Sequence, residues 1–294
     1  MTTGPQRVLL VDGMALLFRA FYATSYNGYI RRTRDGLPTN AVYGFLQYFF
    51  DAVRSFSPTH AACCWDMGSR TFRTEMYASY KANRPLPPPE LVPQFDLVRE
   101  VTAEMGIPNI GVPGYEADDC IGTLAYRFSR ESEVYILTGD HDLLQLVSDR
   151  IRVVILKKGK SNYAVYDPAL LMEEKGLMPH QIVDLKGFMG DPSDNYPGVK
   201  GIGEKIALKL LAEYGSAEGV LAHLHELPKG VRSKIEAGID MLRLSRELAA
   251  IRLDAPVQCR LSDCRFALKV DHAIRKFEEL EFGGLVKLLR QHAG

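Results

Sequence analysis

The segment GYEADDCIG at 114–122 places three carboxylates within four positions, directly before an apolar run. They are Glu116, Asp118 and Asp119. Two carboxylates about 4 Å apart repel by about 4 kcal/mol at an effective dielectric constant of about 20, so something must offset the repulsion. Acidic side chains at the positive N-terminal end of a helix are one explanation. A divalent cation bound by hard oxygen ligands is the other, and this segment alone leaves both open.

Further aspartates end apolar runs that have the composition of buried strands, within 7–13, 59–66 and 133–146. They are Asp12, Asp66, Asp140 and Asp142. The third segment is expected to be a strand through Thr138, then two aspartates, then a helix. Helical patterns between these runs, such as 41–55 and 91–105, predict a parallel sheet with helices on both faces. Ligands of such sheets bind beyond the carboxyl ends of the strands. One aspartate there is ordinarily a turn former, but three successive strands ending in acids favour a shared site.

Basic residues lie between the second and third predicted strands, in the proline-rich segment 70–94. Its three consecutive prolines exclude a helix interior, so an irregular surface segment is the simplest interpretation. The functional alternative is a basic arm over the acidic edge, with Lys81 and Arg84 directed at a phosphate. A further basic stretch, 155–167, has the pattern of a hairpin.

After about residue 175 the pattern becomes wholly helical, and its distinctive part is GVKGIGEKIALKLL at 198–211. Glycines at a helix N-terminus expose backbone N–H groups that can bind an anion, and nearby lysines add positive charge. The residues concerned are Gly198, Gly201 and Gly203 with Lys200, Lys205 and Lys209. A plain packing corner between two helices is the alternative. Just upstream, GDPSDN carries Asp191 and Asp194, which alone would be interpreted as capping residues of a loop.

The composition, with 46% hydrophobic and 24% charged residues, is that of an ordinary globular protein. The 36 basic and 36 acidic residues balance, which argues weakly against a bulk polyanion binder, although acids gathered around metal ions would leave the remaining surface basic. Five cysteines without a C-x-x-C pair, and an N-terminus without an apolar leader, favour a reduced, cytoplasmic setting. The spacing of Cys259, Cys264 and His272 is poor for zinc.

The acids together form an all-oxygen set, for which Mg²⁺ or Mn²⁺ are the suitable cations. Nine carboxylates exceed what one octahedral Mg²⁺ can use, so two ions that clamp both sides of a phosphodiester are the natural account. No serine, cysteine or histidine triad is evident, which favours a metal-activated water as nucleophile. The nine are Asp12, Asp66, Glu116, Asp118, Asp119, Asp140, Asp142, Asp191 and Asp194.

Several long motifs, in this order, resemble those of the 5′→3′ exonuclease and flap endonuclease family, which includes the nuclease domain of bacterial DNA polymerase I. They are LLVDGMALLFRAFYA, GLPTNAVYGF, YKANRP, PGYEADDCIGTLA, TGDHDLLQLV and GDPSDNYPGVKGIGEKIALKLL. The likeness covers the chain to about residue 211 and continues more faintly to about 255. Because the sequence has no polymerase region, it resembles the freestanding bacterial form.

The resemblance implies one metal site built from Asp12, Asp66, Glu116, Asp118 and Asp119. It implies a second from Asp140, Asp142, Asp191 and Asp194, with Asp118 between the two. Lys81 and Arg84 match a basic pair on an arch that contacts the scissile phosphate, and Tyr80 matches an aromatic that stacks on a base. The turn at 198–203 matches a helix-hairpin-helix that grips duplex DNA, with K⁺ held by backbone carbonyls such as those of Val199 and Ile202.

We therefore expect an α/β fold: a parallel-sheet nuclease domain over 1–175, with its arch at about 70–94. A small all-helical DNA-binding domain over 176–294 is expected to contain a helix-hairpin-helix at about 184–212. The expected enzyme is a Mg²⁺-dependent 5′→3′ DNA exonuclease and flap endonuclease of replication and repair. It is expected to act as a monomer on flapped, gapped or 5′-recessed duplex DNA. A DNA-structure binding protein with vestigial chemistry and a PIN-type ribonuclease are the alternatives.

Overall fold

The computed structural model describes residues 6–157 and 161–292. Its centre is a six-stranded sheet in the order β3-β2-β1-β4-β5-β6. The strands are β1 (Arg7–Asp12), β2 (His60–Cys64), β3 (Asn109–Ile110), β4 (Glu133–Thr138), β5 (Ile151–Leu156) and β6 (Tyr163–Tyr166). The first five are mutually parallel, as the sequence predicted, whereas β6 is an antiparallel edge strand. The β5–β6 pairing confirms the predicted hairpin, although residues 158–160 of its turn lie outside the described residues.

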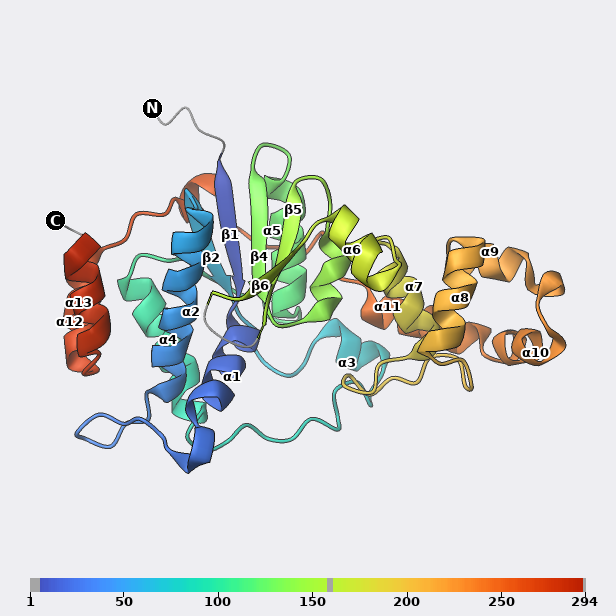
Figure 1. The fold of residues 1–294 in the computed structure, drawn as a ribbon. Helices are drawn as coiled ribbons and strands as arrows, with labels where there is room; N and C mark the ends of the chain where they lie inside the picture. The colour runs from blue at the N-terminus through green and yellow to red at the C-terminus, as the bar shows by residue number, and fades with distance from the viewer. Residues whose placement is uncertain (1–5, 158–160, 293–294) are drawn as a thin grey trace.

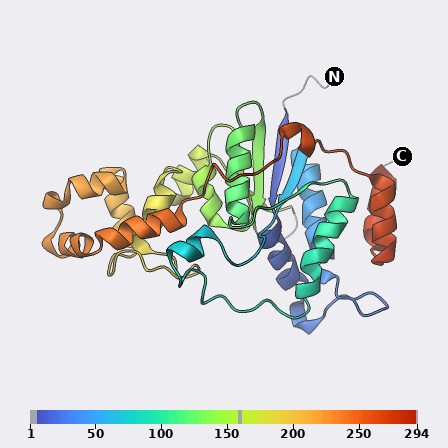
Figure 2. The same cartoon turned by 180° about the vertical axis from the view of Figure 1, so that it is seen from behind.

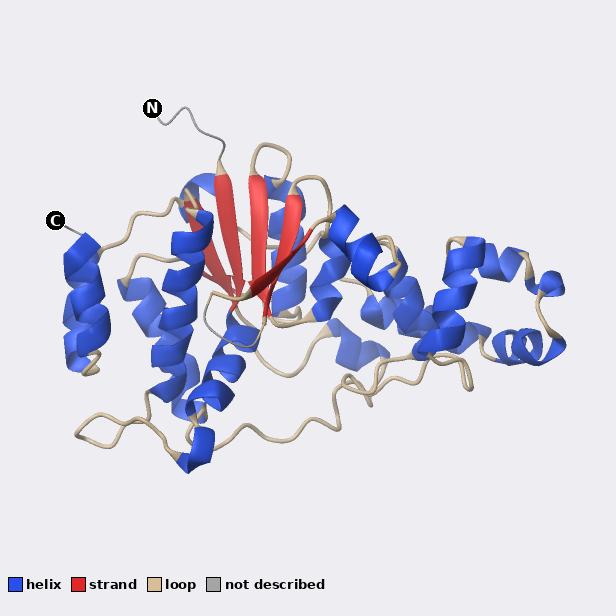
Figure 3. Ribbon diagram, in the orientation of Figure 1, coloured by secondary structure: helices blue, strands red, loops and turns tan. Residues whose placement is uncertain are grey.

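The central strands are largely apolar. Helices cover both faces of the sheet, as Figure 3 shows, so side chains on both faces are buried. In β1, Val8 and Leu10 belong to one hydrophobic cluster and Leu9 and Val11 to the other. Successive side chains of a strand point to opposite faces, so β1 contributes to two separate cores. This continuous burial fixes the register of the sheet, and with it the position of the strand ends.

Helices α1 (Gly13–Thr24), α2 (Asn40–Phe56) and α4 (Val92–Glu104) cover one face of the sheet, and α5 (Ala117–Phe128) covers the other (Figures 1 and 2). The predicted helical patterns at 41–55 and 91–105 correspond to α2 and α4. Both α1 and α5 begin at the carboxyl edge of the sheet, immediately after acidic residues. The layered fold therefore brings two helix N-termini to the edge where the strands end.

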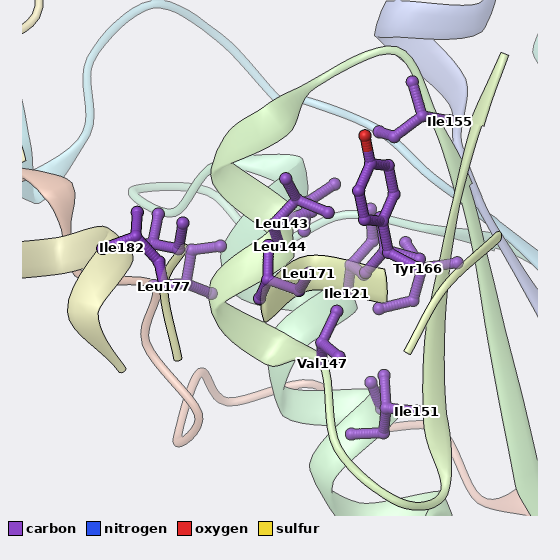
Figure 4. Packing of buried hydrophobic residues seen from close by; sticks show 14 of the residues in the cluster. Ile121, Leu143, Leu144, Val147, Ile151, Ile155, Tyr166, Leu171, Leu177 and Ile182 are labelled. Atoms are coloured by element: carbon purple, nitrogen blue, oxygen red, sulfur yellow. The ribbon is translucent and has the colours of Figure 1, made fainter. Parts of the chain in front are cut away.

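The core beneath α5 continues from the sheet into the helical part of the molecule, as Figure 4 shows for Leu143, Leu144 and Ile182. The segment after β4 was expected to form a regular helix, but it is a 3₁₀ helix, η2 (His141–Leu146). Its length explains the difference, because the chain must turn into β5 shortly after Leu146 and 3₁₀ helices serve as short connectors. The short turn keeps Asp140 and Asp142 at the sheet edge.

The remaining helices form an extension at the side of β6, which reaches away from the sheet in Figure 1. They are α6 (Pro168–Lys175), α7 (Gln181–Met189), α8 (Glu204–Tyr214), α9 (Ala217–Ala222), α10 (Lys229–Ala237) and α11 (Ile239–Ala249), with the 3₁₀ helix η3 (Leu224–Glu226). Helix α7 packs against both α8 and α11. The α7–turn–α8 unit lies where the sequence predicted the helix-hairpin-helix.

The last two helices, α12 (Val270–Glu279) and α13 (Gly283–His292), lie at the opposite end of the molecule from α8–α10 (Figures 1 and 2). Phe277 and Phe282 join the hydrophobic cluster of α2 and α4, and the Phe282 ring meets Tyr43 edge-on at 5.2 Å. Thus part of the segment expected in the helical domain packs on the sheet domain. The division at residue 175 stays a prediction.

Three short elements complete the fold: η1 (Tyr26–Gly28), α3 (Phe72–Met76) and η4 (Leu261–Cys264). The chain between α3 and α4 runs past the carboxyl edge of the sheet (Figure 1). Over the described ranges, no helix is long and apolar enough to cross a lipid bilayer.

Candidate active site

The carboxyl edge of the sheet gathers acids from separate segments, and backbone or hydroxyl donors hold Asp12 and Asp66 there. Asp12 ends β1 and caps α1 by accepting from the Ala15 N–H at 3.0 Å, and it accepts from Thr138 Oγ1 at 2.7 Å. Asp66 accepts from the Ala117 N–H at 2.7 Å, which ties the end of β2 to the start of α5. Rigid elements therefore position these two carboxylates.

At the start of α5, Asp119 is fully buried and satisfied by the protein itself. Its two oxygens accept from the Arg73 guanidinium at 2.7 and 2.9 Å, from the Glu116 N–H at 3.0 Å and from the Arg252 N–H at 2.9 Å. These four donors occupy the hydrogen-bond acceptor sites of the Asp119 carboxylate. The capping explanation thus applies to Asp119, and its role as a metal ligand stays a prediction.

The neighbouring Asp118 makes no ion pair within the described part of the chain. Burial and the nearby charges of Asp140 and Asp12 raise the pKa of Asp118 well above its usual range. Burial, supported by Asp140 and Asp66 and opposed by the two hydrogen bonds, also raises the pKa of Asp12 to about 7. Closely spaced carboxylates short of positive charge are the environment that a divalent cation would relieve.

A second group of acids lies beside the first, at Asp142, Asp191 and Asp194. One oxygen of each lies within 4.8 Å of the others, the only such set of three metal-binding side chains among the residues described. Burial and the charge of Asp140 raise the pKa of Asp142 to about 7, despite an ion pair with Lys186. The five acids assigned to the other metal site share the edge but form no equally compact set there.

Lys186 of α7 is one of the residues in this region that the sequence did not single out. Its ammonium group makes ion pairs with both Asp142 and Asp191. Asp191 also accepts hydrogen bonds from Ser193 N and Oγ. Together with the contact to Lys186, these bonds outweigh the effect of burial and lower the pKa of Asp191. The sequence feature that could have identified Lys186 is its position five residues before Asp191, close to the end of α7.

The two basic residues predicted on the arch both reach the acids. Lys81 Nζ lies 2.8 Å from Glu116 Oε1 and 3.9 Å from Asp194, and Arg84 Nη2 lies 2.6 Å from Asp194 Oδ1. The attraction to Glu116 and Asp194 outweighs burial and raises the pKa of Lys81. The arch cations are thus placed between the two acidic groups, and Arg84 is half exposed.

Tyr80 is buried rather than open for stacking on a base. Its hydroxyl lies 3.1 Å from Glu116 Oε2 and 3.0 Å from Asp194 Oδ2, and its ring stacks on Tyr196 at 6.3 Å. In this structure the side chain bridges the two acidic groups, so its predicted contact with DNA stays a prediction.

Backbone contacts fix this part of the arch to the loop that carries Asp194. The Lys81 N–H donates to the Asp194 carbonyl at 2.9 Å, Asn83 donates to the Pro192 carbonyl, and Asn195 donates to the Ser79 carbonyl. Lys81 has a φ of 56°, a left-handed conformation that is uncommon outside glycine. Such a conformation persists only where surrounding contacts impose it.

An open cleft of about 540 Å³ lies beside the acids and includes Asp140, Asp142, Asp191 and Lys186 in its wall. Arg19 of α1 lines the same cleft, which gives it a basic side chain that the sequence interpretation did not consider. The cleft is large enough for a phosphodiester segment to approach the carboxylates.

The turn between α7 and α8 has the conformation that its glycines suggested. Gly198 has a φ of 61°, and a Cβ there would lie 2.2 Å from the Gly190 nitrogen. The Val199 N–H bonds the Phe188 carbonyl, and the Val199 carbonyl accepts from the Ile202 N–H. Lys200, Lys205 and Lys209 are exposed around this turn. The roles of these residues in holding K⁺ and DNA stay predictions.

Among the residues described, no cysteine belongs to a group of three metal-binding side chains. Cys259 and Cys264 have sulfur atoms 3.3 Å apart, whereas His272 pairs with Glu104. The oxygen donors at the sheet edge are instead the set that fits a hard divalent cation.

Two family models match consecutive parts of the chain: the N-terminal resolvase-like domain of 5′-3′ exonucleases over residues 7–176 and their C-terminal SAM fold over 177–271. A 5′-3′ exonuclease of Bacillus subtilis is 50% identical, with 97% of this chain and 96% of that protein covered. DNA polymerase I of Bacillus caldotenax is 43% identical over 94% of this chain, which spans 32% of that longer protein.

Solved structures share the fold. T5 5′-exonuclease with bound divalent metal ions has a TM-score of 0.69 at 22% identity, covering 98% of this chain and 100% of that one. The catalytic core of Rad2 in complex with a DNA substrate has a TM-score of 0.59 at 15% identity, covering 94% and 87% of the two chains. At these identities the likeness establishes the architecture, including the sheet and the helical extension.

Proposed function

The chain belongs to the 5′-3′ exonuclease family and is a hydrolytic nuclease, and we propose that it cleaves DNA phosphodiesters at 5′ flaps, gaps or recessed ends with two divalent metal ions. The wider setting proposed is DNA replication and repair, in the cytoplasm. Mg²⁺ is the proposed ion, with Mn²⁺ as a substitute, because all the donors are oxygens.

The observation that carries the proposal is the deficit of positive charge at the carboxyl edge. Asp12 and Asp142 have pKa values raised to about 7, and Asp118 is raised as well, because buried carboxylates face one another. Such an arrangement is unfavourable for the protein alone. It is understandable where bound cations supply the missing charge during function.

The proposed chemistry divides between the ions and the chain. Two divalent ions would activate a water and neutralise the phosphate oxygens. Asp12, Asp66, Glu116 and Asp118 would hold one side of this centre, and Asp140, Asp142, Asp191 and Asp194 the other, with Asp118 between the two. Asp119 would support the first of these sides indirectly, because its carboxylate accepts a hydrogen bond from the N–H of Glu116.

Lys81 and Arg84 are proposed to donate to the scissile phosphate. Their side chains end between Glu116 and Asp194, so a phosphate at this edge lies within reach of both. Hydrogen-bond donors fixed before the reaction stabilise charge that develops in the transition state. The arch contacts to residues 192–195 supply that fixed position.

Duplex DNA is proposed to lie along the helical extension, at the turn between α7 and α8. Lys200, Lys205 and Lys209 are exposed there and would contact phosphates without reading bases. A K⁺ ion held by backbone carbonyls of the turn, including Val199 and Ile202, belongs to the same proposal. The protein is proposed to act on DNA as a monomer.

The experiment that tests this function is incubation with 5′-labelled flap, gapped and recessed duplexes in Mg²⁺ or in EDTA. Release of 5′-phosphorylated fragments in Mg²⁺ alone supports the proposal. Binding of the flap without cleavage would instead support a vestigial enzyme. Cleavage of RNA in preference to DNA would support the ribonuclease alternative.

A further inference from the structure

Lys186 pairs with two of the acids that are proposed to hold a metal ion. It lies on α7, yet its ammonium group contacts Asp142 of η2 and Asp191 of the loop after α7. Its side chain is 18% exposed, so it is largely enclosed by these acids. Within the described ranges, no other lysine or arginine makes an ion pair with either carboxylate.

The contacts of Lys186 coincide with the compact acidic set. Asp142, Asp191 and Asp194 bring one oxygen each within 4.8 Å of the others, and two of the three acids bind this ammonium. Asp194 is instead engaged by Arg84 and by Tyr80. The second acidic group is therefore provided with its own positive charge, whereas Asp12 and Asp118 make no ion pair among the residues described.

A divalent ion and the Lys186 ammonium cannot use the same oxygens together. Mg²⁺ binds carboxylates at about 2.1 Å in a nearly ideal octahedron, and the ammonium bridges Asp142 and Asp191 at the place where their oxygens converge. A lysine side chain has a flexible four-carbon stem and a compact charge. It can leave the acids without a change in α7.

We propose that Lys186 is an internal counter-ion, which holds the second acidic group together in the metal-free enzyme and competes with the divalent ion that binds there. This inference rests on the proposed two-metal function. It adds that the two sites bind the divalent ion with unequal affinity. The site built around Asp12 and Asp118 fills first, and the site at Asp142 and Asp191 fills only when Lys186 has been displaced.

The test is a titration of the DNA-free protein with Mn²⁺. Binding is measured by isothermal titration calorimetry and by the electron spin resonance signal of the free Mn²⁺. Wild type, Lys186→Met and Lys186→Arg are compared, with Lys287→Met as the matched control because Lys287 is an exposed lysine of α13. The wild type is expected to bind one ion tightly and one weakly. Lys186→Met is expected to tighten the weak site by about tenfold or more, because one competing charge is removed.

The other variants separate charge from packing. Lys186→Arg keeps the charge and is expected to titrate like the wild type, and so is Lys287→Met. In EDTA, Lys186→Met is expected to have a lower melting temperature than the wild type, and Mn²⁺ is expected to raise that temperature by more than it does in the wild type. This readout does not depend on cleavage.

Two results would overturn the inference. An unchanged or weakened second site in Lys186→Met, with two sites still present in the wild type, would refute competition and leave the proposed function standing. Weaker binding of flap DNA in Ca²⁺ by Lys186→Met, with unchanged Mn²⁺ affinities, would make Lys186 a phosphate contact. A wild type that binds only one ion under any condition would refute the two-metal proposal itself, so the two failures are distinguishable.

Discussion

Arg73 and Asp119 form a doubly hydrogen-bonded ion pair in which both side chains are buried, with N–O distances of 2.7 and 2.9 Å. Arg73 belongs to α3 and also donates to the carbonyls of Leu248, in the last turn of α11, and of Ala250, which follows α11. The pair thus joins the base of the arch to the start of α5 and to the chain leaving the helical extension. Its effect on the active site is indirect, because it orients Glu116 rather than facing the cleft.

We expect Asp119→Ala to destabilise the protein by about 3–5 kcal/mol, since removing one partner leaves a buried charge unpaired. The neighbouring variant Asp118→Ala is the control, because Asp118 has no ion-pair partner in the described structure and is repelled by Asp140 and Asp12. Urea unfolding in EDTA measures both. Equal losses of unfolding free energy in the two variants would contradict this division of roles.

The contrast between these adjacent acids shows what the sequence could and could not provide. The strand ends were predictable, because a parallel sheet brings Asp12, Asp66 and Asp140 to one edge once the strands are recognised. The sequence could not tell that Asp119 faces Arg73 while Asp118 faces the other acids. That depends on a partner 46 residues away in the chain.

Other differences have the same origin in long-range packing. In the sequence, Lys186 is indistinguishable from an ordinary helix residue. Its contact with Asp142 depends on the packing of η2 beside α7. The return of α12 and α13 to the α2–α4 face depends on Phe277 and Phe282 meeting that surface. An apolar helical pattern predicts that a face is buried, but it does not identify the surface that covers it.

The stability of the metal-free protein should depend on pH through Asp12 and Asp142. Both carboxyls have pKa values of about 7 in the folded state, against an ordinary value of 3.8. The folded state therefore binds more protons than the unfolded state between these values, and stability falls as the pH rises through that range. In EDTA, the unfolding free energy is expected to be higher at pH 6 than at pH 8.

Asp12→Asn is the variant that checks the assignment, because the amide keeps the size of the side chain and removes its charge. We expect a smaller difference between pH 6 and pH 8 in this variant than in the wild type. An identical difference would show that other carboxyls with raised pKa values, such as Asp142 and Asp118, carry the pH dependence. His60 and His141 have lowered pKa values and would change stability in the opposite direction.

Lys81→Ala and Arg84→Ala should each reduce the single-turnover rate by about 10²-fold or more, as expected for the loss of a preorganised donor. Affinity for flap DNA, measured in Ca²⁺ to prevent cleavage, should change much less, because the contact strengthens in the transition state. A fall in affinity with an intact saturated rate in both variants would reduce the role of these residues to binding.

Charge reversal at two of Lys200, Lys205 and Lys209 should weaken duplex binding for every sequence alike and flatten its dependence on salt. Exposure of all three around the α7–α8 turn is the reason. Fluorescence anisotropy at several salt concentrations measures the slope. A slope equal to that of the wild type would place the DNA track on another surface.

The most direct test of the two-metal account is the cleavage of labelled flap DNA by Asp140→Ala in Mg²⁺. Asp140 lies at the end of β4, where it caps η2 by accepting from the Asp142 N–H at 2.8 Å, and its charge raises the pKa values of Asp118 and Asp142. The account predicts that cleavage is abolished while flap binding in Ca²⁺ and the melting temperature are retained. Undiminished turnover by this variant, or full activity of the wild type in excess EDTA, would contradict it.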